Sequence, residues 1–504
     1  MLPLILWLAI ASPVLAAAVE RRPSPLITRG EGYIRAGVSA VKGAAPYLRR
    51  RQNEVGIEGE GKGQHYVVDI QIGTPPQTVS VIVDTGSSDL WVNPNCANTF
   101  DPAECNAEPY YDYTRSSTFN DTGYSDFLAY GSGNVTVEWV FETVSLGSAT
   151  VKKQILGVAI DSDNIPKGIL GLAEDIDGQN NYNYILDSMV KQGAINSRAF
   201  SLDLRSIEST DGAIIFGGVD TGKFSGALKK VPILEPPQTP HGTDRYWVSM
   251  TGVGITLPDG TTDRSKEISV PVFIDSGGTL SQLPTAIFQA IGNSFPGAEY
   301  HAPSGLFIVD CNKVDKDGSV DFYFGDKAIS VPFTDFIWNP DGVCRLGVKA
   351  NDDEPILGAS FLRAAYAVYD QDNRNIHLAQ AANCGTNIVA IGSGTDAVPS
   401  STGECTGPGA PTNTASVRSL DVTGTRAATK TYTGNNPAIT NPVGGGPGPV
   451  VSRVSTTGAL NPTNPTAAAS ATATGKKNAG SSVNVGLGAG AALVAVNMAA
   501  AWGL

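Results

Sequence analysis

Residues 83–88 read VDTGSS, and residues 274–278, about 190 positions further on, read IDSGG. In both places an apolar run typical of a buried strand leads directly into an aspartate and a glycine turn. Burying one carboxylate is costly, but two carboxylates brought together can share a single proton and so supply a general base and a general acid. We therefore predict that Asp84 and Asp275 form one catalytic site.

A second element repeats along the chain in the same way. The tripeptide ILG occurs at residues 169–171 and again at residues 356–358, so that its glycine lies 87 residues after the first acid and 83 residues after the second. A lone DTG or DSG triplet is a weak signal in a chain of 504 residues, because it arises by chance. The repeated spacing is stronger, and it indicates a duplicated structural unit.

With these motifs and several shorter ones, the chain resembles the pepsin-type aspartic endopeptidases, and in its layout the fungal yapsins and candidapepsins, over roughly residues 60–385. The shorter motifs are DLWV at 89–92, YGSG at 130–133, GILGL at 168–172, YW at 246–247 and FLR at 361–363. The resemblance implies an all-β, bilobal fold with two duplicated β lobes, residues 52–245 and 246–390, around a central active-site cleft. It also implies an aspartic endopeptidase of the EC 3.4.23 class, which hydrolyses polypeptides at acidic pH without a cofactor.

The resemblance gives the two acids their roles. Asp84 and Asp275 would hold one water between them, so that the ionised acid takes its proton while the protonated acid hydrogen-bonds the scissile carbonyl. No covalent intermediate is needed. Gly86 and Gly277 would keep both turns tight enough for the two loops to approach each other without a clashing Cβ.

Hydroxyl side chains beside the acids would support them. By resemblance, Thr85 and Ser276 hydrogen-bond across to the opposite loop, and Ser87 bonds the outer oxygen of the first acid. The sequence departs from the family pattern in the second turn, where Gly278 occupies the position that matches Ser87. We therefore expect the second acid to lack an outer hydroxyl partner.

Tyr130 lies on an alternating stretch followed by glycines, a pattern that favours a hairpin able to bend over a cleft. By resemblance, Tyr130 and Gly131 belong to the flap, and the Tyr130 hydroxyl reaches the indole N–H of Trp91. Without the resemblance, a tyrosine before Gly-x-Gly is an ordinary aromatic beside a turn. The flap prediction therefore depends on the two acid turns.

Composition and charge narrow the function further. The 57 glycines and 32 prolines favour many turns over long helices, and 41% hydrophobic residues suffice for a large core. The net charge is −13, but residues 1–51 carry +6, which leaves −19 for the remainder. So acidic a body would repel phosphate, which argues against a nucleic-acid partner, and it suits work at low pH.

The cysteines and histidines give no metal-ligand spacing and no support for a histidine-based triad, so we predict no metal. The six cysteines fall in pairs that are near in sequence, which favours disulfides without proving their connectivity. By resemblance the first two pairs are bridges found in pepsin-like lobes, and the third is a weaker prediction. The pairs are Cys96 with Cys105, Cys311 with Cys344, and Cys384 with Cys405.

The N-terminal region has the features of a targeting signal followed by a pro-segment. Residues 1–16 are apolar and end in small residues, as in a secretory signal peptide. Residues 17–51 are basic and end in Leu48-Arg49-Arg50-Arg51, which is open to a dibasic-processing protease. We predict a pro-segment that holds a zymogen by the attraction of its cations to an acidic cleft. The alternative is an ordinary solvated linker.

The C-terminal region changes in composition. Residues 391–482 are rich in Ser, Thr, Gly and Pro and are predicted to form an extended stalk. Residues 483–504 are weakly apolar and follow small residues, as in the removed signal for a glycosylphosphatidylinositol (GPI) anchor, with Asn478 as the attachment site and Gly480 or Ser481 as alternatives. This predicts a glycoprotein anchored at the cell surface, on the outer leaflet of the plasma membrane or in the wall. A transmembrane helix is the competing interpretation.

Two N-glycosylation acceptor patterns, at Asn120 and Asn134, fit the secretory route. Two other functions compete with a protease, a catalytically idle binding protein of the same fold and a wall-attached adhesion protein, and the alternative protease assembly is a retroviral-type homodimer. The last is disfavoured because one chain carries both acids, so we expect a monomer. Asp101 and Glu104 lie between the first two cysteines, where acids near a cleft would favour basic side chains in the substrate, as in the yapsins that the chain resembles; the alternative is that they are ordinary solvated surface acids.

Overall fold

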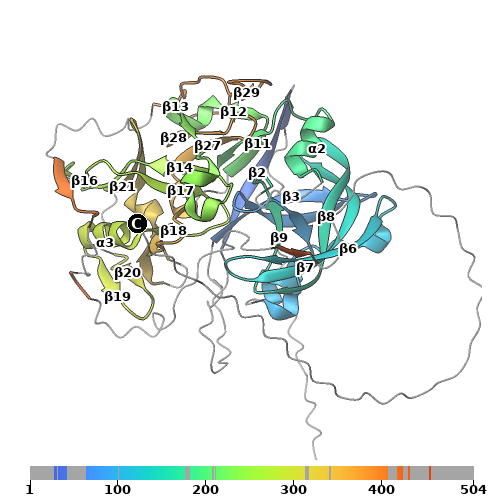
Figure 1. The fold of residues 1–504 in the computed structure, drawn as a ribbon, viewed down its shortest axis with the longest axis horizontal. Helices are drawn as coiled ribbons and strands as arrows, with labels where there is room; N and C mark the ends of the chain where they lie inside the picture. The colour runs from blue at the N-terminus through green and yellow to red at the C-terminus, as the bar shows by residue number, and fades with distance from the viewer. Residues whose placement is uncertain are drawn as a thin grey trace, which may run out of the picture. The chain divides into compact units, whose positions relative to one another are not determined.

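The computed structural model describes the greater part of residues 28–455 (Figure 1). The described residues are 28–30, 32–42, 64–99, 102–175, 182–206, 209, 212–312, 317–339, 342–406, 417–423, 429–431 and 453–455. Strands hold 48% of them and helices 13%, which confirms the all-β prediction. The predicted signal peptide, the C-terminal tail 483–504 and the anchor residues Asn478, Gly480 and Ser481 lie outside this part of the chain.

The strands of the first half and of the connecting region are β1 (Thr28–Gly30), β2 (Tyr33–Lys42), β3 (Gln64–Ile72), β4 (Gln77–Asp84), β5 (Leu90–Val92), β6 (Asn120–Ala129), β7 (Asn134–Leu146), β8 (Ala149–Asp163), β9 (Gly168–Gly171), β10 (Ala199–Asp203), β11 (Gly212–Phe216), β12 (Gly218–Asp220) and β13 (Phe224–Pro232). Those of the second half are β14 (Trp247–Met250), β15 (Gly252–Thr256), β16 (Thr262–Ser265), β17 (Val270–Ile274), β18 (Ser281–Leu283), β19 (Glu299–His301), β20 (Leu306–Val309), β21 (Ser319–Phe324), β22 (Lys327–Pro332), β23 (Ile337–Trp338), β24 (Cys344–Leu346), β25 (Val348–Ala350), β26 (Ile356–Leu357), β27 (Ala365–Asp370), β28 (Asn375–Ala381), β29 (Ile388–Ala390), β30 (Val417–Leu420) and β31 (Arg453–Ser455).

The helices are short and few within the described ranges. The α-helices are α1 (Pro102–Ala107), α2 (Ile185–Lys191), α3 (Thr285–Ser294), α4 (Phe333–Phe336) and α5 (Ala359–Leu362), and the 3-10 turns are η1 (Cys96–Asn98), η2 (Tyr113–Arg115), η3 (Thr221–Lys223), η4 (Pro236–Gln238) and η5 (Pro240–Gly242). None of the helices seen in these ranges has the length and apolar character needed to span a membrane.

The duplicated sequence unit corresponds to a duplicated strand arrangement. In the first half β4 pairs in parallel with β9, and Asp84 lies opposite Gly171. In the second half β17 pairs in parallel with β26, and Ile274 lies opposite Leu357. The three residues before each acid, 81–83 in β4 and 272–274 in β17, are apolar and buried, as expected where parallel strands are covered on both faces. Each acid therefore follows directly from a buried strand.

The glycine that ends each ILG tripeptide has a steric reason. A Cβ on Gly171 would lie 2.4 Å from the backbone nitrogen of Asp89, and a Cβ on Gly358 would lie 2.6 Å from the carbonyl oxygen of Leu280. Both contacts are with main chain, which cannot move aside cheaply. The backbone that follows each acid turn therefore packs closely against the ILG segment of the same half.

Strands of the two halves join in one 15-stranded sheet, in the order β13-β28-β27-β10-β11-β2-β3-β4-β9-β5-β8-β7-β6-β31, with β1 beside β2. The remaining second-half strands form separate sheets, among them β14-β17-β26-β18-β25 and β22-β21-β15-β16-β30. Strand β2, from the predicted pro-segment, is an interior member between β11 and β3 (Figure 1). Its Ile34, Ala36 and Val38 are buried in the main core.

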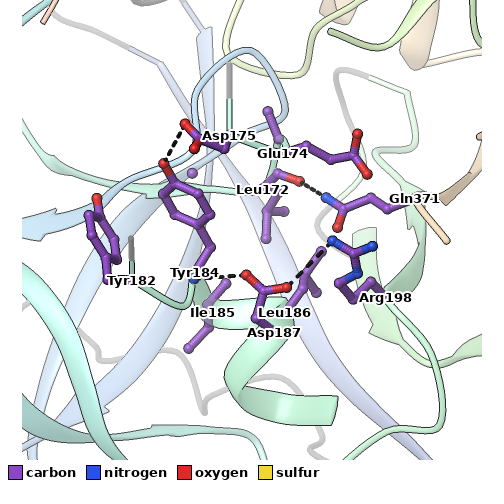
Figure 2. Close-up of a pocket in the computed structure, with 12 residues that line it drawn as sticks. Leu172, Glu174, Asp175, Tyr182, Tyr184, Ile185, Leu186, Asp187, Arg198 and Gln371 are labelled. Atoms are coloured by element: carbon purple, nitrogen blue, oxygen red, sulfur yellow. Dashed lines mark hydrogen bonds and ion pairs between the residues drawn. The ribbon is translucent and has the colours of Figure 1, made fainter. Parts of the chain in front are cut away.

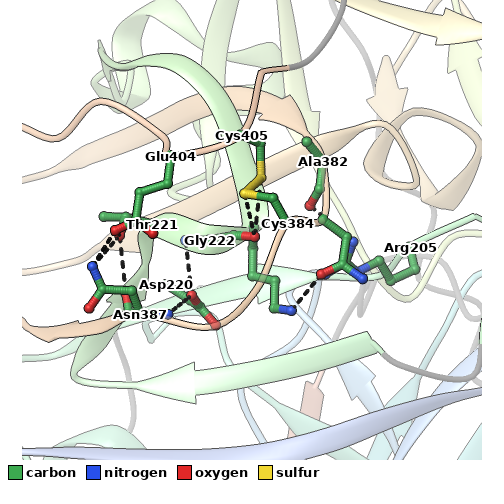
Figure 3. Close-up of a disulfide and its surroundings, with 11 residues drawn as sticks. Arg205, Asp220, Thr221, Gly222, Ala382, Cys384, Asn387, Glu404 and Cys405 are labelled. Carbon is green, nitrogen blue, oxygen red and sulfur yellow. Dashed lines mark hydrogen bonds between the residues drawn. A yellow bond between two sulfur atoms is a disulfide. The ribbon is translucent and has the colours of Figure 1, made fainter.

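The folded body extends beyond residue 390, where we predicted that the stalk begins. Strand β29 pairs with β12, and Ile391 and Val398 are buried in a core cluster with Phe224. A bond between Cys384 and Cys405 closes this segment (Figure 3). Residues 391–406, which the sequence assigned to the stalk, therefore pack on the body through Ile391, Val398 and Cys405. A few apolar residues in a polar stretch are enough when a disulfide restricts the segment.

Hydrogen bonds hold the same segment to η3. The Asp220 carboxylate accepts the N–H of Gly222 over 3.1 Å and that of Asn387 over 2.7 Å. The Glu404 carboxylate accepts the Thr221 hydroxyl over 2.9 Å (Figure 3). Polar residues in a segment whose composition suggested a stalk thus hold two loops together by hydrogen bonds.

Candidate active site

The two acid turns meet in the interior of the molecule. Asp84 is the last residue of β4, and Asp275 directly follows β17. Both carboxyl groups are fully buried. A Cβ on Gly86 would lie 2.8 Å from Oδ1 and 2.9 Å from Oδ2 of Asp275, so the carboxyl of the second turn rests directly against the first turn. Only glycine leaves room for this approach.

The Asp84 carboxylate has a donor for each of its oxygens. The backbone N–H of Gly86 donates to Oδ1 over 2.8 Å, and the hydroxyl of Ser87 donates to Oδ2 over 2.5 Å. Hydrogen bonds to the ionised form stabilise it. The first turn is therefore built to hold a carboxylate that carries a negative charge.

The Asp275 carboxyl is supported on one side. The backbone N–H of Gly277 donates to Oδ1 over 2.8 Å, in the same way as Gly86 does in the first turn. The other oxygen, Oδ2, is buried and accepts no hydrogen bond from a hydroxyl or N–H group of the described residues, while the Asp84 and Asp275 carboxyls are hydrogen-bonded to each other. Gly278 stands where the first turn has Ser87, so the hydroxyl that would reach this oxygen is missing.

The loops that carry the acids are tied together by Thr85 and Ser276. The N–H of Thr85 donates to Ser276 Oγ over 3.1 Å, and the N–H of Ser276 donates to Thr85 Oγ1 over 2.9 Å. Each hydroxyl then donates onward, that of Thr85 to the carbonyl of Ile274 over 3.0 Å and that of Ser276 to the carbonyl of Val83 over 2.7 Å. The four bonds fix the two acids relative to each other.

Burial dominates the ionisation of both acids. It raises the pKa of Asp84, while hydrogen bonds from Ser87 and Gly86 act in the opposite direction. It raises the pKa of Asp275 well above its usual range, and the charge of Asp84 raises it further. Two close carboxyls in one buried site cannot both ionise easily, so they titrate as a pair. The arrangement favours one shared proton in the acid range.

A hairpin with an aromatic residue at its turn lies near the acids. Strands β6 and β7 form this hairpin, and the N–H of Tyr130 donates to the carbonyl of Gly133 across the turn over 2.8 Å. The indole N–H of Trp91 donates to the Tyr130 hydroxyl over 2.8 Å. Both aromatic side chains are buried, while Gly131 at the tip is exposed. The pKa of Tyr130 is raised well above its ordinary value by burial and by the charges of Asp89 and Asp84.

The three cysteine pairs are bonded to each other in the structure. They are Cys96–Cys105, Cys311–Cys344 and Cys384–Cys405. Within the described ranges, no cluster of three or more His, Cys, Asp and Glu side chains has the arrangement of a metal site.

Acidic side chains of the first disulfide loop are not free. Lys167 is almost fully buried, and its ammonium group lies 2.5 Å from the carboxylate of Glu108 and 3.9 Å from that of Glu104. Asp101 lies outside the described residues. Glu104, the described carboxylate of this loop, thus shares one internal cation with the neighbouring Glu108, which weakens the expectation that it selects basic substrates.

Sequence reasoning missed Arg245, which directly precedes the YW motif. Arg245 is buried, and its positive charge lowers the pKa of both Asp84 and Asp275, though less than burial raises them. Its guanidinium lies 5.4 Å from the ring centre of Phe273. A buried arginine has no local signature in the sequence, because a single charged residue is usually predicted to lie on the surface.

A pocket of about 170 Å³ adjoins the segment that follows β9 (Figure 2). The N–H of Leu172 donates to the Asp84 carbonyl over 2.9 Å, and its carbonyl accepts the Gln371 amide over 3.0 Å. In the same pocket Glu174 has its pKa raised to about 7 by burial, against the opposing charge of Arg198. Two residues that line the pocket, Leu172 and Gln371, thus hold the backbone next to Asp84 in place by hydrogen bonds.

The two predicted glycosylation sites differ in exposure. Asn120 begins β6 and is exposed, whereas Asn134 begins β7 just after the flap turn and is only partly exposed.

Comparisons with known proteins agree with this geometry. The family model "Eukaryotic aspartyl protease" matches residues 65–381. The probable aspartic-type endopeptidase opsB of Aspergillus oryzae is 32% identical over 380 residues, which make up 70% of this chain and 76% of that protein. Candidapepsin-3 and Secreted aspartic protease 3 of Candida albicans are each 34% identical over 343 residues, covering 65% of this chain and 82% of theirs.

A solved structure supports the fold. The crystal structure of aspartic proteinase from Irpex lacteus aligns with a TM-score of 0.51 at 24% identity, and covers 63% of this chain and 94% of that chain. The pepsin-like fold expected from the sequence is thereby confirmed. With its two acid turns joined in one buried site and a family match over most of its folded body, the chain belongs to the eukaryotic aspartyl protease family.

Proposed function

We propose that this aspartic endopeptidase hydrolyses peptide bonds at acidic pH with a water that Asp84 and Asp275 activate together. The ionised acid takes a proton from the water as its oxygen bonds to the scissile carbonyl carbon, and the protonated acid gives its proton to the carbonyl oxygen. The resulting neutral diol collapses when the first acid returns its proton to the leaving nitrogen and a diol hydroxyl re-protonates the second. No residue becomes covalently bound to the substrate.

The observation that carries this proposal is the placement of two fully buried carboxyls on reciprocally bonded loops. Burial without a paired cation at hydrogen-bond distance is costly for two charges, and it becomes acceptable when one proton is shared. Because the pKa of each acid is raised, the singly protonated pair persists toward neutral pH and is lost when both acids ionise. Activity is therefore expected on the acid side of neutrality.

The test is hydrolysis of a denatured protein at acidic pH, with and without pepstatin. The wild-type enzyme should cleave and be inhibited, while the single variants Asp84→Asn and Asp275→Asn should fold but not turn over. A catalytically idle binding protein is the second candidate, favoured by the missing donor at Gly278. It would bind pepstatin without hydrolysing anything, so the same assay separates the two functions.

We propose no preference for basic residues at the cleavage site. This is supported by Lys167, whose ammonium group pairs with Glu108 and lies 3.9 Å from Glu104 of the first disulfide loop. Cleavage-site profiling with a peptide library tests it, and a strong excess of Lys or Arg beside the cleaved bond would reject it.

We propose that residues 17–51 form a pro-segment on a chain that enters the secretory route through residues 1–16. Cleavage after the basic run at 49–51 would separate β2 from the enzyme, and strands β11 and β3 would then lose the neighbour that lies between them. The segment is therefore a structural part of the precursor. Mass spectrometry of the mature protein should lack residues 20–48, and their retention would reject the pro-segment.

We propose that the C-terminal region beyond residue 406 connects the enzyme to a GPI anchor at Asn478, with Gly480 or Ser481 as alternatives, and that the enzyme acts as a monomer at the cell surface. The composition and order of these segments support the proposal. Release of the protein from intact cells by a phosphatidylinositol-specific phospholipase tests the anchor, since a transmembrane helix would not be released. Loss of mass on deglycosylation tests Asn120 and Asn134.

A further inference from the structure

Arg245 lies where the backbone before β14 meets the second acid turn. Strands β14 and β17 pair antiparallel and lie side by side (Figure 1). The pairing continues onto the residue before β14, because the N–H of Ile274 donates to the carbonyl of Tyr246 over 3.2 Å. One step further along this register, Arg245 comes opposite Asp275.

The Arg245 side chain lies on the same face as the second acid. Side chains alternate along a strand, so Phe273 and Asp275 point to one face, and the N–H of Asp275 still donates to the neighbouring strand, at the Leu357 carbonyl over 3.0 Å. The guanidinium carbon of Arg245 lies 5.4 Å from the ring centre of Phe273. Arg245 is only 6% exposed, so water screens its charge weakly.

The backbone that carries Arg245 is held by bonds on either side. The N–H of Trp247 donates to the Arg245 carbonyl over 2.7 Å. The hydroxyl of Tyr246 donates to the Leu172 carbonyl over 2.6 Å, and the N–H of Leu172 donates to the Asp84 carbonyl over 2.9 Å. Arg245 is thus tied through its neighbours to the first acid turn as well as to the second.

We propose that Arg245 is a positioning residue for the reaction, whose fixed positive charge holds the Asp84–Asp275 pair in its singly ionised form as the medium becomes acid. This inference rests on the proposed function and goes beyond it by naming the residue that sets its acid limit. Burial of two carboxyls favours full protonation, which would leave no base. The charge of Arg245 opposes that effect, since it lowers the pKa of both acids and is never lost by titration.

Two tyrosine hydroxyls also interact with the pair, that of Tyr130 with Asp84 and that of Tyr369 with Asp275. Burial raises the pKa of both tyrosines above its ordinary value. Both hydroxyls are therefore uncharged at the acidic pH at which the pair titrates, so neither of them supplies or cancels a charge there.

A second group of charges adjoins Arg245 in sequence. Asp244 accepts hydrogen bonds from the guanidinium of Arg374 over 2.9 and 3.3 Å, and the same guanidinium bonds Glu235 over 3.2 Å and Glu174 over 3.3 Å. Burial raises the pKa of Glu174 to about 7, so this acid is protonated at acidic pH. Because this group is built around its own arginine, a substitution at Arg245 leaves these bonds in place.

The experiment compares the pH dependence of kcat/KM for the wild type, Arg245→Met, Arg245→Gln and Arg245→Lys. Removing the positive charge makes both protonations of the pair easier, so both limbs of the Arg245→Met and Arg245→Gln profiles should move up by roughly one pH unit. On the low-pH limb that shift is about a tenfold loss of kcat/KM at a given pH. Arg245→Lys keeps the charge and should keep both limbs. Unmoved limbs in a folded neutral variant would overturn the proposal.

Arg363→Met is the matched control. Arg363 is also buried, and its guanidinium donates to the carbonyl of Asp335 over 2.9 Å, outside the acid turns. This variant should lose stability and keep both limbs, while an equal shift of its limbs would show that the profile follows stability alone and would overturn the proposal.

Circular dichroism checks the fold of each variant. If both neutral variants fail to fold, the Arg245→Lys profile decides: unmoved limbs support the proposal, and limbs displaced upward although the charge is kept overturn it. Failure of the proposed function gives a different result, because the wild type itself would then show no hydrolysis that depends on Asp84 and Asp275.

Discussion

Thr85 and Ser276 are bonded to each other twice, each backbone N–H donating to the hydroxyl of the other residue, over 3.1 and 2.9 Å. The two residues are 191 positions apart in sequence, and both are buried. Their bonds couple the second residue of one acid turn to the second residue of the other. Any loss at this contact should therefore affect both the stability of the fold and the spacing of the acids.

The first prediction concerns Ser276→Ala. The change leaves the N–H of Thr85 and the carbonyl of Val83 without their partner in a buried site, which should lower the free energy of unfolding by about 1–3 kcal/mol. Turnover should fall as well, because the acids are no longer held in register. Urea unfolding and kcat measure the two effects.

Ser201→Ala is a matched control for that variant. Ser201 is equally buried, and its hydroxyl bonds to the Gly218 carbonyl over 2.9 Å, but its partners lie outside the acid turns. It should lose stability while it keeps its turnover. Equal losses of turnover in both variants would show that Thr85 and Ser276 act only through general stability.

The second prediction concerns Tyr130→Phe. The change removes the hydroxyl that accepts the Trp91 indole N–H, while the aromatic ring and its packing remain. Turnover should fall by about tenfold or more if this hairpin is a flap, because it loses the bond that fixes it near Asp84. The free energy of unfolding should fall by about 1–3 kcal/mol, because the buried Trp91 N–H loses its acceptor. Tyr366→Phe, which removes a buried hydroxyl bonded to Ser201, should lose a similar amount of stability but keep its turnover.

The third prediction concerns pH and His65. Burial, and to a smaller extent the charge of Lys167, lowers the pKa of His65 from 6.5 to about 4, and neither ring nitrogen has a hydrogen-bond partner among the described residues. Between pH 6.5 and 4 the unfolded chain binds a proton that the folded chain excludes. The free energy of unfolding is therefore not reduced by His65 above pH 6.5. As the pH falls toward 4, the penalty for keeping His65 neutral lowers the free energy of unfolding by on the order of 3 kcal/mol.

His65→Leu removes that titration. In an inactive Asp84→Asn background, which prevents self-digestion, the variant should lose less stability than its parent between pH 7 and 4. Urea midpoints at several pH values measure the difference. Identical pH dependence in the two proteins would mean that the folded state protonates His65 without a penalty.

The fourth prediction concerns the third disulfide. Cys384 and Cys405 are 21 residues apart, and a loop of that length corresponds to about 3 kcal/mol in chain entropy. Replacing both with alanine should lower the stability by up to that amount and make residues 391–406 accessible to an added protease. Limited proteolysis followed by mass spectrometry locates the cuts. A segment that stays protected would show that strand pairing alone holds it.

Much of the site could be predicted from the sequence, because its elements carry local signals. The acid turns are marked by an apolar strand before the acid and a glycine after it, and Gly278 is visible as a departure from the repeat. The resemblance named Thr85 and Ser276 as the residues that meet across the lobes. Short motifs of this kind can be recognised in a sequence, because backbone sterics restrict which residue fits at each position.

The parts that were not predicted depend on partners far away in sequence. The insertion of β2 between β11 and β3 has no local marker, since Ile34, Ala36 and Val38 alternate like any half-buried strand. Residues 391–406 read as a stalk because their composition is polar, although the third disulfide and bridges to β13 hold them on the body. Tertiary pairing overrode local composition in both places.

The most direct test of the account is kcat at acidic pH for Asp275→Asn beside the wild type, with the fold of the variant checked by circular dichroism. Asparagine keeps the shape of the side chain but cannot release a proton to the scissile carbonyl. If the two acids share the proton that drives hydrolysis, kcat should fall by about 10³-fold or more while the fold is retained. A folded Asp275→Asn enzyme with wild-type turnover would contradict the shared-proton site.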